Sequence, residues 1–99
     1  MWLHNKRNSE GKWIMAEYEG WKNYDTWNVS LWINNERNLY EGAVDFMKNE
    51  NPDPQNPYRA FVISCGLEAQ KTPDDVAYMA DTLDYEALND MMRELIEWL

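Results

Sequence analysis

The chain has 99 residues, a formal net charge of −9 and 44% hydrophobic residues, among them six tryptophans and six tyrosines. A chain of this length buries only about two thirds of its unfolded surface, which is enough for one domain (1–99) with one aromatic-rich core and excludes two independent domains. The negative field disfavours binding to nucleic acid or to an anionic membrane.

The single cysteine excludes an intrachain disulfide and is typical of a reducing compartment. The N-terminal residues lack the apolar run of a signal peptide, and no stretch approaches the roughly 18 apolar residues that span a bilayer. We therefore expect a soluble, unsecreted protein.

The first twenty residues contain two short apolar-rich runs, MWLHNK and KWIMAEY, separated by RNSEG. The Asn, Ser and Gly suit a tight connection, so the pattern predicts a β-hairpin over 1–20. A lone hairpin is marginally stable and needs helices to cover it, and these are expected over 21–99. The predicted fold class is α+β: a mostly helical single domain with the N-terminal hairpin packed on four or five helices.

The stretch YDTWNVSLWINNERNLY, residues 24–40, fits two periods. Its alternation of apolar and polar residues is strand-like, whereas Trp27 and Leu31 stand four residues apart behind Asp25, a good helix N-cap. We predict a helix here, with Trp27 and Leu31 in the core. Asn34 and Asn35 then predict a stop or a new N-cap before a second helix, NERNLYEGAVDFMKNEN.

The middle of the chain begins with the proline-rich loop NENPDPQNP. Pro57 predicts the first turn of a third helix that ends at Gly66, with Cys65 on its apolar face as a small core residue. Thr72, followed by a proline and acidic residues, predicts a short helix through about Ala80.

The last segment, YEALNDMMRELIEWL behind the N-cap Asp84, predicts an amphipathic helix. At 100° per residue one sector is apolar, and it contains Leu88, Met91, Met92, Leu95 and Leu99. The opposite stripe is acidic, and it contains Glu86, Asp90, Glu94 and Glu97. Residues 67–99 hold nine acidic and two basic side chains, a net charge of −7.

This acidic stripe has two interpretations. A plain solvated face is common on the surface helices of acidic proteins. Alternatively, carboxylates about 5 to 6 Å apart approximate the charge density of a nucleic-acid strand, as in a DNA-mimicking inhibitor. Trp32 lies about 140° around the first helix from Trp27 and must meet another element or a partner.

No catalytic or metal-binding pattern is present. His4 is the only histidine, so neither a histidine-based metal site nor a Cys/His/Asp constellation can be assembled. Phosphate-binding and calcium-binding loops are absent from the sequence. We expect no enzyme and no cofactor.

The stretch KNYDTWNVSLWINNERNLY resembles a family of small proteins encoded by tailed phages and other mobile elements, which carry an NYxTWNVxLWI signature. The matching residues are Asn23, Tyr24, Thr26, Trp27, Asn28, Val29, Leu31, Trp32 and Ile33. The segment TPDDVAYMADTLDYEALNDMM resembles the C-terminal part of the same family. The resemblance favours a helix for the signature and implies a phage gene product acting in the cytoplasm of an infected bacterium.

These observations predict a non-enzymatic accessory protein that inhibits a host nucleic-acid-handling defence protein, such as a restriction or CRISPR component, by occluding its basic surface. The candidate contact residues are Glu86, Asp90, Glu94, Glu97, Asp74, Asp75, Asp81 and Trp32. The alternative is a homo-oligomeric structural or assembly protein, with a two-fold interface formed by Trp21, Tyr24 and Trp32.

Overall fold

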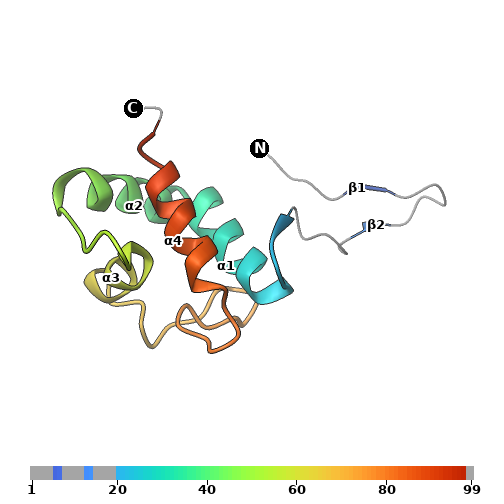
Figure 1. Cartoon of the computed structure of the whole chain (residues 1–99). Helices are drawn as coiled ribbons and strands as arrows, with labels where there is room; N and C mark the ends of the chain where they lie inside the picture. The colour runs from blue at the N-terminus through green and yellow to red at the C-terminus, as the bar shows by residue number, and fades with distance from the viewer. Residues whose placement is uncertain (1–5, 8–12, 15–19, 98–99) are drawn as a thin grey trace.

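The computed structural model describes residues 6–7, 13–14 and 20–97 (Figure 1). Within these residues the domain is all-helical and consists of α1 (Tyr24–Asn35), α2 (Arg37–Asn49), α3 (Pro57–Ser64) and α4 (Tyr85–Glu94). Helices α2 and α4 each contact all of the other three helices. None of the described helices is long and apolar enough to cross a membrane.

The predicted α+β fold, with an N-terminal hairpin packed on the helices, is wrong. The described part of 1–20 contains only two two-residue strands, β1 (Lys6–Arg7) and β2 (Trp13–Ile14), which pair with each other. Neither strand's backbone lies against a described helix, and Figure 1 shows the pair set apart from the helical domain. A lone two-stranded pair is at best marginally stable. Most of the predicted hairpin lies outside the described residues.

The break between α1 and α2 is made by one residue. The backbone N–H of Glu36 donates to Trp32 O at 2.9 Å and ends α1, while Glu36 Oε1 accepts the N–H of Leu39 at 2.8 Å and begins α2. Asn35 is the last residue of α1, so the predicted stop is confirmed. The N-cap of α2 is Glu36 rather than an asparagine.

Helix α3 begins at Pro57, as predicted, but its N-terminus is capped by another helix. Its own cap residue, Asn56, makes no side-chain capping bond. Instead Asn89 of α4, which is buried, accepts the N–H of Tyr58 at 3.0 Å and donates to Gln55 O at 3.2 Å. Gly66 follows α3 with φ +71, the left-handed conformation expected of a residue that ends a helix.

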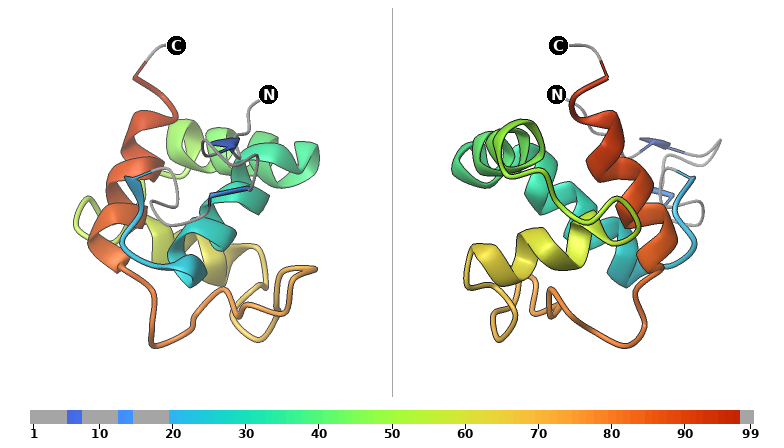
Figure 2. Two further views of the ribbon diagram at one scale, coloured as in Figure 1. Left: turned by 90° about the vertical axis from the view of Figure 1, so that its right-hand side faces the viewer. Right: turned by 60° about the vertical axis from the view of Figure 1, so that its left-hand side comes forward.

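The predicted helix from Thr72 to about Ala80 is also wrong. Thr72 Oγ1 accepts the N–H groups of Asp74 and Val76, both at 3.2 Å, and these bonds close a turn. Asp75 has φ +72, which a helix cannot accommodate. The segment between α3 and α4 is therefore a series of turns, and Figure 2 shows it running around one end of the domain.

The core lies between the four helices and this turn segment. Phe46 of α2 and Phe61 of α3 meet in it with ring centroids 5.8 Å apart, and the buried Tyr58 hydroxyl donates to Tyr78 O at 2.6 Å. Burial raises the pKa of Tyr58 well above its usual range. The buried hydrophobic residues are Val29, Ile33, Ala43, Phe46, Tyr58, Phe61, Val62, Val76, Tyr78, Leu83, Leu88, Met91 and Met92.

Two predicted core residues and the cysteine lie elsewhere. Trp27 and Leu31 are only half-buried and are not among the described residues that pack against the core cluster. Helix α1 instead turns Val29 and Ile33 inward. Cys65 is exposed, because α3 ends before it and its side chain leaves the apolar face.

The cap that α4 supplies to α3 gives a stability prediction. Asn89→Ala should lower the free energy of unfolding by about 1 to 3 kcal/mol, because the buried N–H of Tyr58 loses its acceptor. Urea denaturation measures this value, with Asn38→Ala at an exposed position of α2 as the matched control. Equal stability of the two variants would contradict the role of Asn89.

Candidate acidic interaction face

Helix α4 presents its acidic residues on the side opposite the core. Glu86, Asp90 and Glu94 are all exposed, while Leu88 and Met92 are fully buried. Asp84 Oδ1 accepts the N–H of Ala87 at 3.2 Å, so the predicted N-cap is confirmed. Glu97 is exposed as well, but it lies in a turn beyond the last helical residue, Glu94. Of the predicted apolar sector, Leu99 lies outside the described residues.

Only one carboxylate of this stripe has a basic neighbour among the described residues. Arg93 Nη1 lies 2.6 Å from Asp90 Oδ1, and Arg93 Nη2 donates to Pro54 O at 2.8 Å. Within the described part of the chain, the carboxylates of Glu86, Glu94 and Glu97 make no hydrogen bond or ion pair. The outer side of α4 therefore keeps most of its negative charge.

Asp74 and Trp32, both candidate contact residues, bond to each other. Asp74 Oδ2 accepts the indole N–H of Trp32 and an amide N–H of Asn28, each at 2.8 Å. The bonds from Asn28 and Trp32 lower the pKa of Asp74. These two residues thus join the turn segment to α1. From its position on the helix, Trp32 was expected to meet another element or a partner, and that element is the turn segment.

The other two candidates lie in the same turn segment. Asp75 Oδ1 is 3.2 Å from Lys71 Nζ in an exposed ion pair, and Asp81 is exposed shortly before α4. Asp74 faces α1, whereas Asp90 and Glu94 line a hollow on α4. The seven acidic candidates are therefore divided between the turn segment and the outer side of α4.

The signature stretch folds into a set of polar contacts at the N-terminal half of α1. Asn23, rather than the predicted Asp25, is the N-cap: its Oδ1 accepts the N–H of Thr26 at 2.9 Å and the hydroxyl of Thr26 at 2.7 Å. The same Thr26 hydroxyl accepts the N–H of Asp84 at 2.9 Å. Asn23 Nδ2 donates to Thr82 O at 2.8 Å. The start of α1 is thereby bonded to the start of α4.

Asn28 forms the second part of this polar contact. It is completely buried, and its Oδ1 accepts the hydroxyl of Thr72 at 2.7 Å while its Nδ2 donates to Asp74. The side-chain amide of Asn28 has both a donor and an acceptor, so it satisfies Thr72 and Asp74 at once. The signature residues Asn23, Thr26, Asn28 and Trp32 therefore have a structural role in holding the turn segment.

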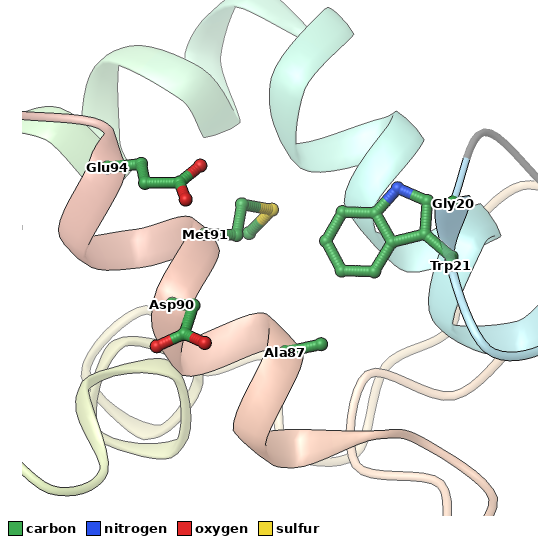
Figure 3. A pocket seen from close by; sticks show the side chains of 6 residues that line it. All are labelled: Gly20, Trp21, Ala87, Asp90, Met91 and Glu94. Carbon is green, nitrogen blue, oxygen red and sulfur yellow. The ribbon is translucent and has the colours of Figure 1, made fainter.

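A hollow of about 310 Å³ separates the segment before α1 from α4. Its lining residues are Gly20, Trp21, Ala87, Asp90, Met91 and Glu94. Figure 3 shows the Trp21 indole on one side, Met91 and Ala87 facing it from α4, and the carboxylates of Asp90 and Glu94 along the helix. Gly20 has φ +93, a backbone conformation that favours glycine and directs the chain into Trp21.

Only part of this hollow could be predicted from the sequence. The spacing of Asp90 and Glu94, one helical turn apart, placed both carboxylates on one side of α4. Nothing in the order of residues indicated that Trp21 would lie opposite them, because that contact joins segments about seventy residues apart in the chain.

The family of the chain follows from a match over residues 14–98, which include the signature and all four helices. The chain belongs to DUF7249, a family of unknown function. No curated protein and no solved structure matches it.

The described residues offer little to a metal or a nucleophilic reaction. No group of three or more His, Cys, Asp or Glu within them could hold a metal ion, and His4 lies outside them. Cys65 borders a shallow hollow with Ser64 and Asp45. Desolvation raises the pKa of its thiol, which disfavours the reactive thiolate at neutral pH.

The lowered pKa of Asp74 predicts how its contribution depends on pH. A carboxyl group whose pKa is lower in the folded state stabilises fully above its unfolded pKa, about 3.9, and loses this contribution as pH falls through the lower folded value. Asp74→Ala should therefore shift the urea midpoint most at pH 7 and progressively less below pH 4. Asp45→Ala, at an exposed position of α2, controls for the loss of one negative charge. A midpoint difference for Asp74→Ala that stays constant from pH 7 to pH 2.5 would refute the prediction.

Proposed function

We propose that this protein is a non-enzymatic binding module that engages a basic surface of another protein through the acidic side of α4. The observation that carries the proposal is the exposure of Glu86, Asp90 and Glu94 along one helix, with Arg93 as the only basic residue paired to them among the described residues. Like charges one turn apart destabilise a helix slightly, so a role in recognition accounts for a feature that folding does not favour.

Electrostatics supports a partner of opposite charge. The net charge of −9 is concentrated in the last third of the chain, and charges of one sign steer an oppositely charged partner during encounter. Exposed charges are screened over about 10 Å at 0.1 M salt, so association through this face should weaken as salt rises. Glu86 to Glu94 spans about 12 Å of helix, at about 1.5 Å per residue, which suits a short basic ridge or groove wall.

The biological setting of the proposal comes from the resemblance of the signature stretch to phage and mobile-element proteins. We propose that the protein acts inside an infected bacterium and inhibits a nucleic-acid-handling defence protein, a restriction or CRISPR component. Such proteins bind phosphates through grooves lined by Lys and Arg. The carboxylates of α4 would occupy such a groove and exclude the nucleic acid by charge and bulk.

The alternative, a homo-oligomer that joins through Trp21, Tyr24 and Trp32, has weaker support. The indole N–H of Trp32 is already bonded to Asp74, and Trp21 packs partly against the core. Tyr24 is 39% exposed, but it too has contacts within the chain. Contacts within the chain thus account for all three aromatic side chains without a two-fold interface.

Charge-neutralising variants test the proposed function. The interface variant carries Glu86→Gln, Glu94→Gln and Glu97→Gln, and the matched control carries Asp45→Asn, Glu50→Gln and Glu68→Gln. All six positions are exposed, and the two variants have the same net charge. Affinity capture from bacterial lysate, with elution by salt, identifies the bound protein, and its dissociation constant is then measured from 50 to 300 mM salt.

We expect the interface variant to bind the captured protein at least tenfold more weakly, and the control variant to bind within about twofold of the wild type, because only the former changes the contact surface. The affinity of the wild type should fall as salt rises. An equal loss in both variants would show that net charge alone matters and would reject α4 as the binding face.

A further inference from the structure

We propose that the hollow between Trp21 and α4 binds one arginine side chain of the basic partner. This inference rests on the proposed function and specifies it: the acidic side of α4 would supply general attraction, and the hollow would supply a specific anchor. The occupant is chosen by the chemistry of the lining, which combines an indole, a thioether and two carboxylates.

The apolar part of the hollow fits the stem and the flat face of an arginine. Trp21 is half-buried and stands opposite Met91 and Ala87 (Figure 3). The Met91 sulfur accepts a contact from Asn34 Nδ2 at 3.3 Å, which holds the thioether at the edge of α1. Aromatic faces attract cations, and a guanidinium also stacks on the ring as a planar group.

The charged part of the hollow fits the end of the same side chain. The Glu94 carboxylate makes no hydrogen bond or ion pair within the described residues, so it is available to a ligand. Asp90 already contacts Arg93 through Oδ1, which restrains its side chain beside the hollow. A guanidinium can donate two parallel hydrogen bonds to one carboxylate, and an ammonium cannot.

Other ligands fit the lining less well. An anion would be repelled by Asp90 and Glu94, and a purely apolar side chain would place these carboxylates in a poorly solvated contact. A metal ion would find only two carboxylates, fewer than the groups that commonly hold one. A lysine could satisfy the charge but would gain less from the flat indole.

Two labelled peptides of equal length and charge test the proposal. One alternates Arg and Gly over nine residues, and the other alternates Lys and Gly. Binding to the full chain is measured by fluorescence anisotropy at 50 mM salt for the wild type, Trp21→Leu, Glu94→Gln and the control Glu86→Gln. Glu86 lies on the same helix but does not line the hollow. Circular dichroism checks that each variant is folded.

We expect the wild type to bind the Arg peptide about threefold to fivefold more tightly than the Lys peptide. Trp21→Leu and Glu94→Gln should abolish this preference, while Glu86→Gln should keep it and weaken both peptides equally. Glu94→Gln leaves the core packing intact, so it remains informative if Trp21→Leu unfolds.

The possible failures are distinguishable. Equal affinity for the two peptides, with both weakened by Glu86→Gln, would overturn the arginine site and leave the proposed binding face standing. An absence of binding to either peptide would overturn both. Light scattering at the same concentrations tests whether a second copy of the chain fills the hollow. A dimer that Trp21→Leu dissociates would mean that it does, and this too would overturn the proposal.

Discussion

The domain depends on a buried polar contact between α1 and the segment that leads into α4. Asn28 is completely enclosed and is satisfied on both sides, by the Thr72 hydroxyl and by the Asp74 carboxylate. Leaving a buried polar group without its partner costs about 1 to 3 kcal/mol, a large fraction of the stability of a small domain. The turn segment is therefore held in one arrangement although it contains no regular helix or strand.

The position of α4 follows from that contact. The Thr26 hydroxyl accepts the N–H of Asp84, and Asp84 in turn caps the first turn of α4. Further along α4, Asn89 caps α3 and Arg93 bonds to the proline-rich loop. Helix α4 is thus fixed by polar bonds as well as by its buried methionines, and its acidic side faces outward as a consequence.

The helices with one clear apolar stripe were predictable from sequence. The periodicity of α4 placed Leu88, Met91 and Met92 inward, and Pro57 marked the start of α3 because its conformation suits a first helical turn. The acidic residues of α4 were also placed correctly on the solvent side, since they lie opposite that stripe. Local rules suffice where one element's own pattern decides its orientation.

Two failures come from polar contacts that periodicity does not describe, long-range for α1 and within four residues for the segment after Thr72. Helix α1 was expected to bury Trp27 and Leu31, yet it buries Thr26 and Asn28, because the turn segment supplies matching donors and acceptors. The residues after Thr72 were expected to form a helix, yet the Thr72 hydroxyl takes two of their N–H groups. No periodicity in a single stretch reveals such partners.

The grouping of Trp21 with Asp90 and Glu94 belongs to the same class of long-range contact. The position of Trp21 opposite the two carboxylates depends on where α4 lies, and α4 is placed by the contacts of Thr26 and Asn28. The proposed binding face is therefore tied to the signature residues indirectly: they position the surface and do not form it.

Amide hydrogen exchange at Asp84 tests this account most directly. Thr26→Val replaces the hydroxyl that accepts the Asp84 N–H with a methyl group of similar size. We expect the Asp84 amide to be protected in the wild type and to exchange roughly threefold to tenfold faster in the variant, relative to the Val62 amide of α3 as a reporter of global unfolding. Unchanged relative protection at Asp84 would contradict the claim that the polar contacts of α1 position the start of α4.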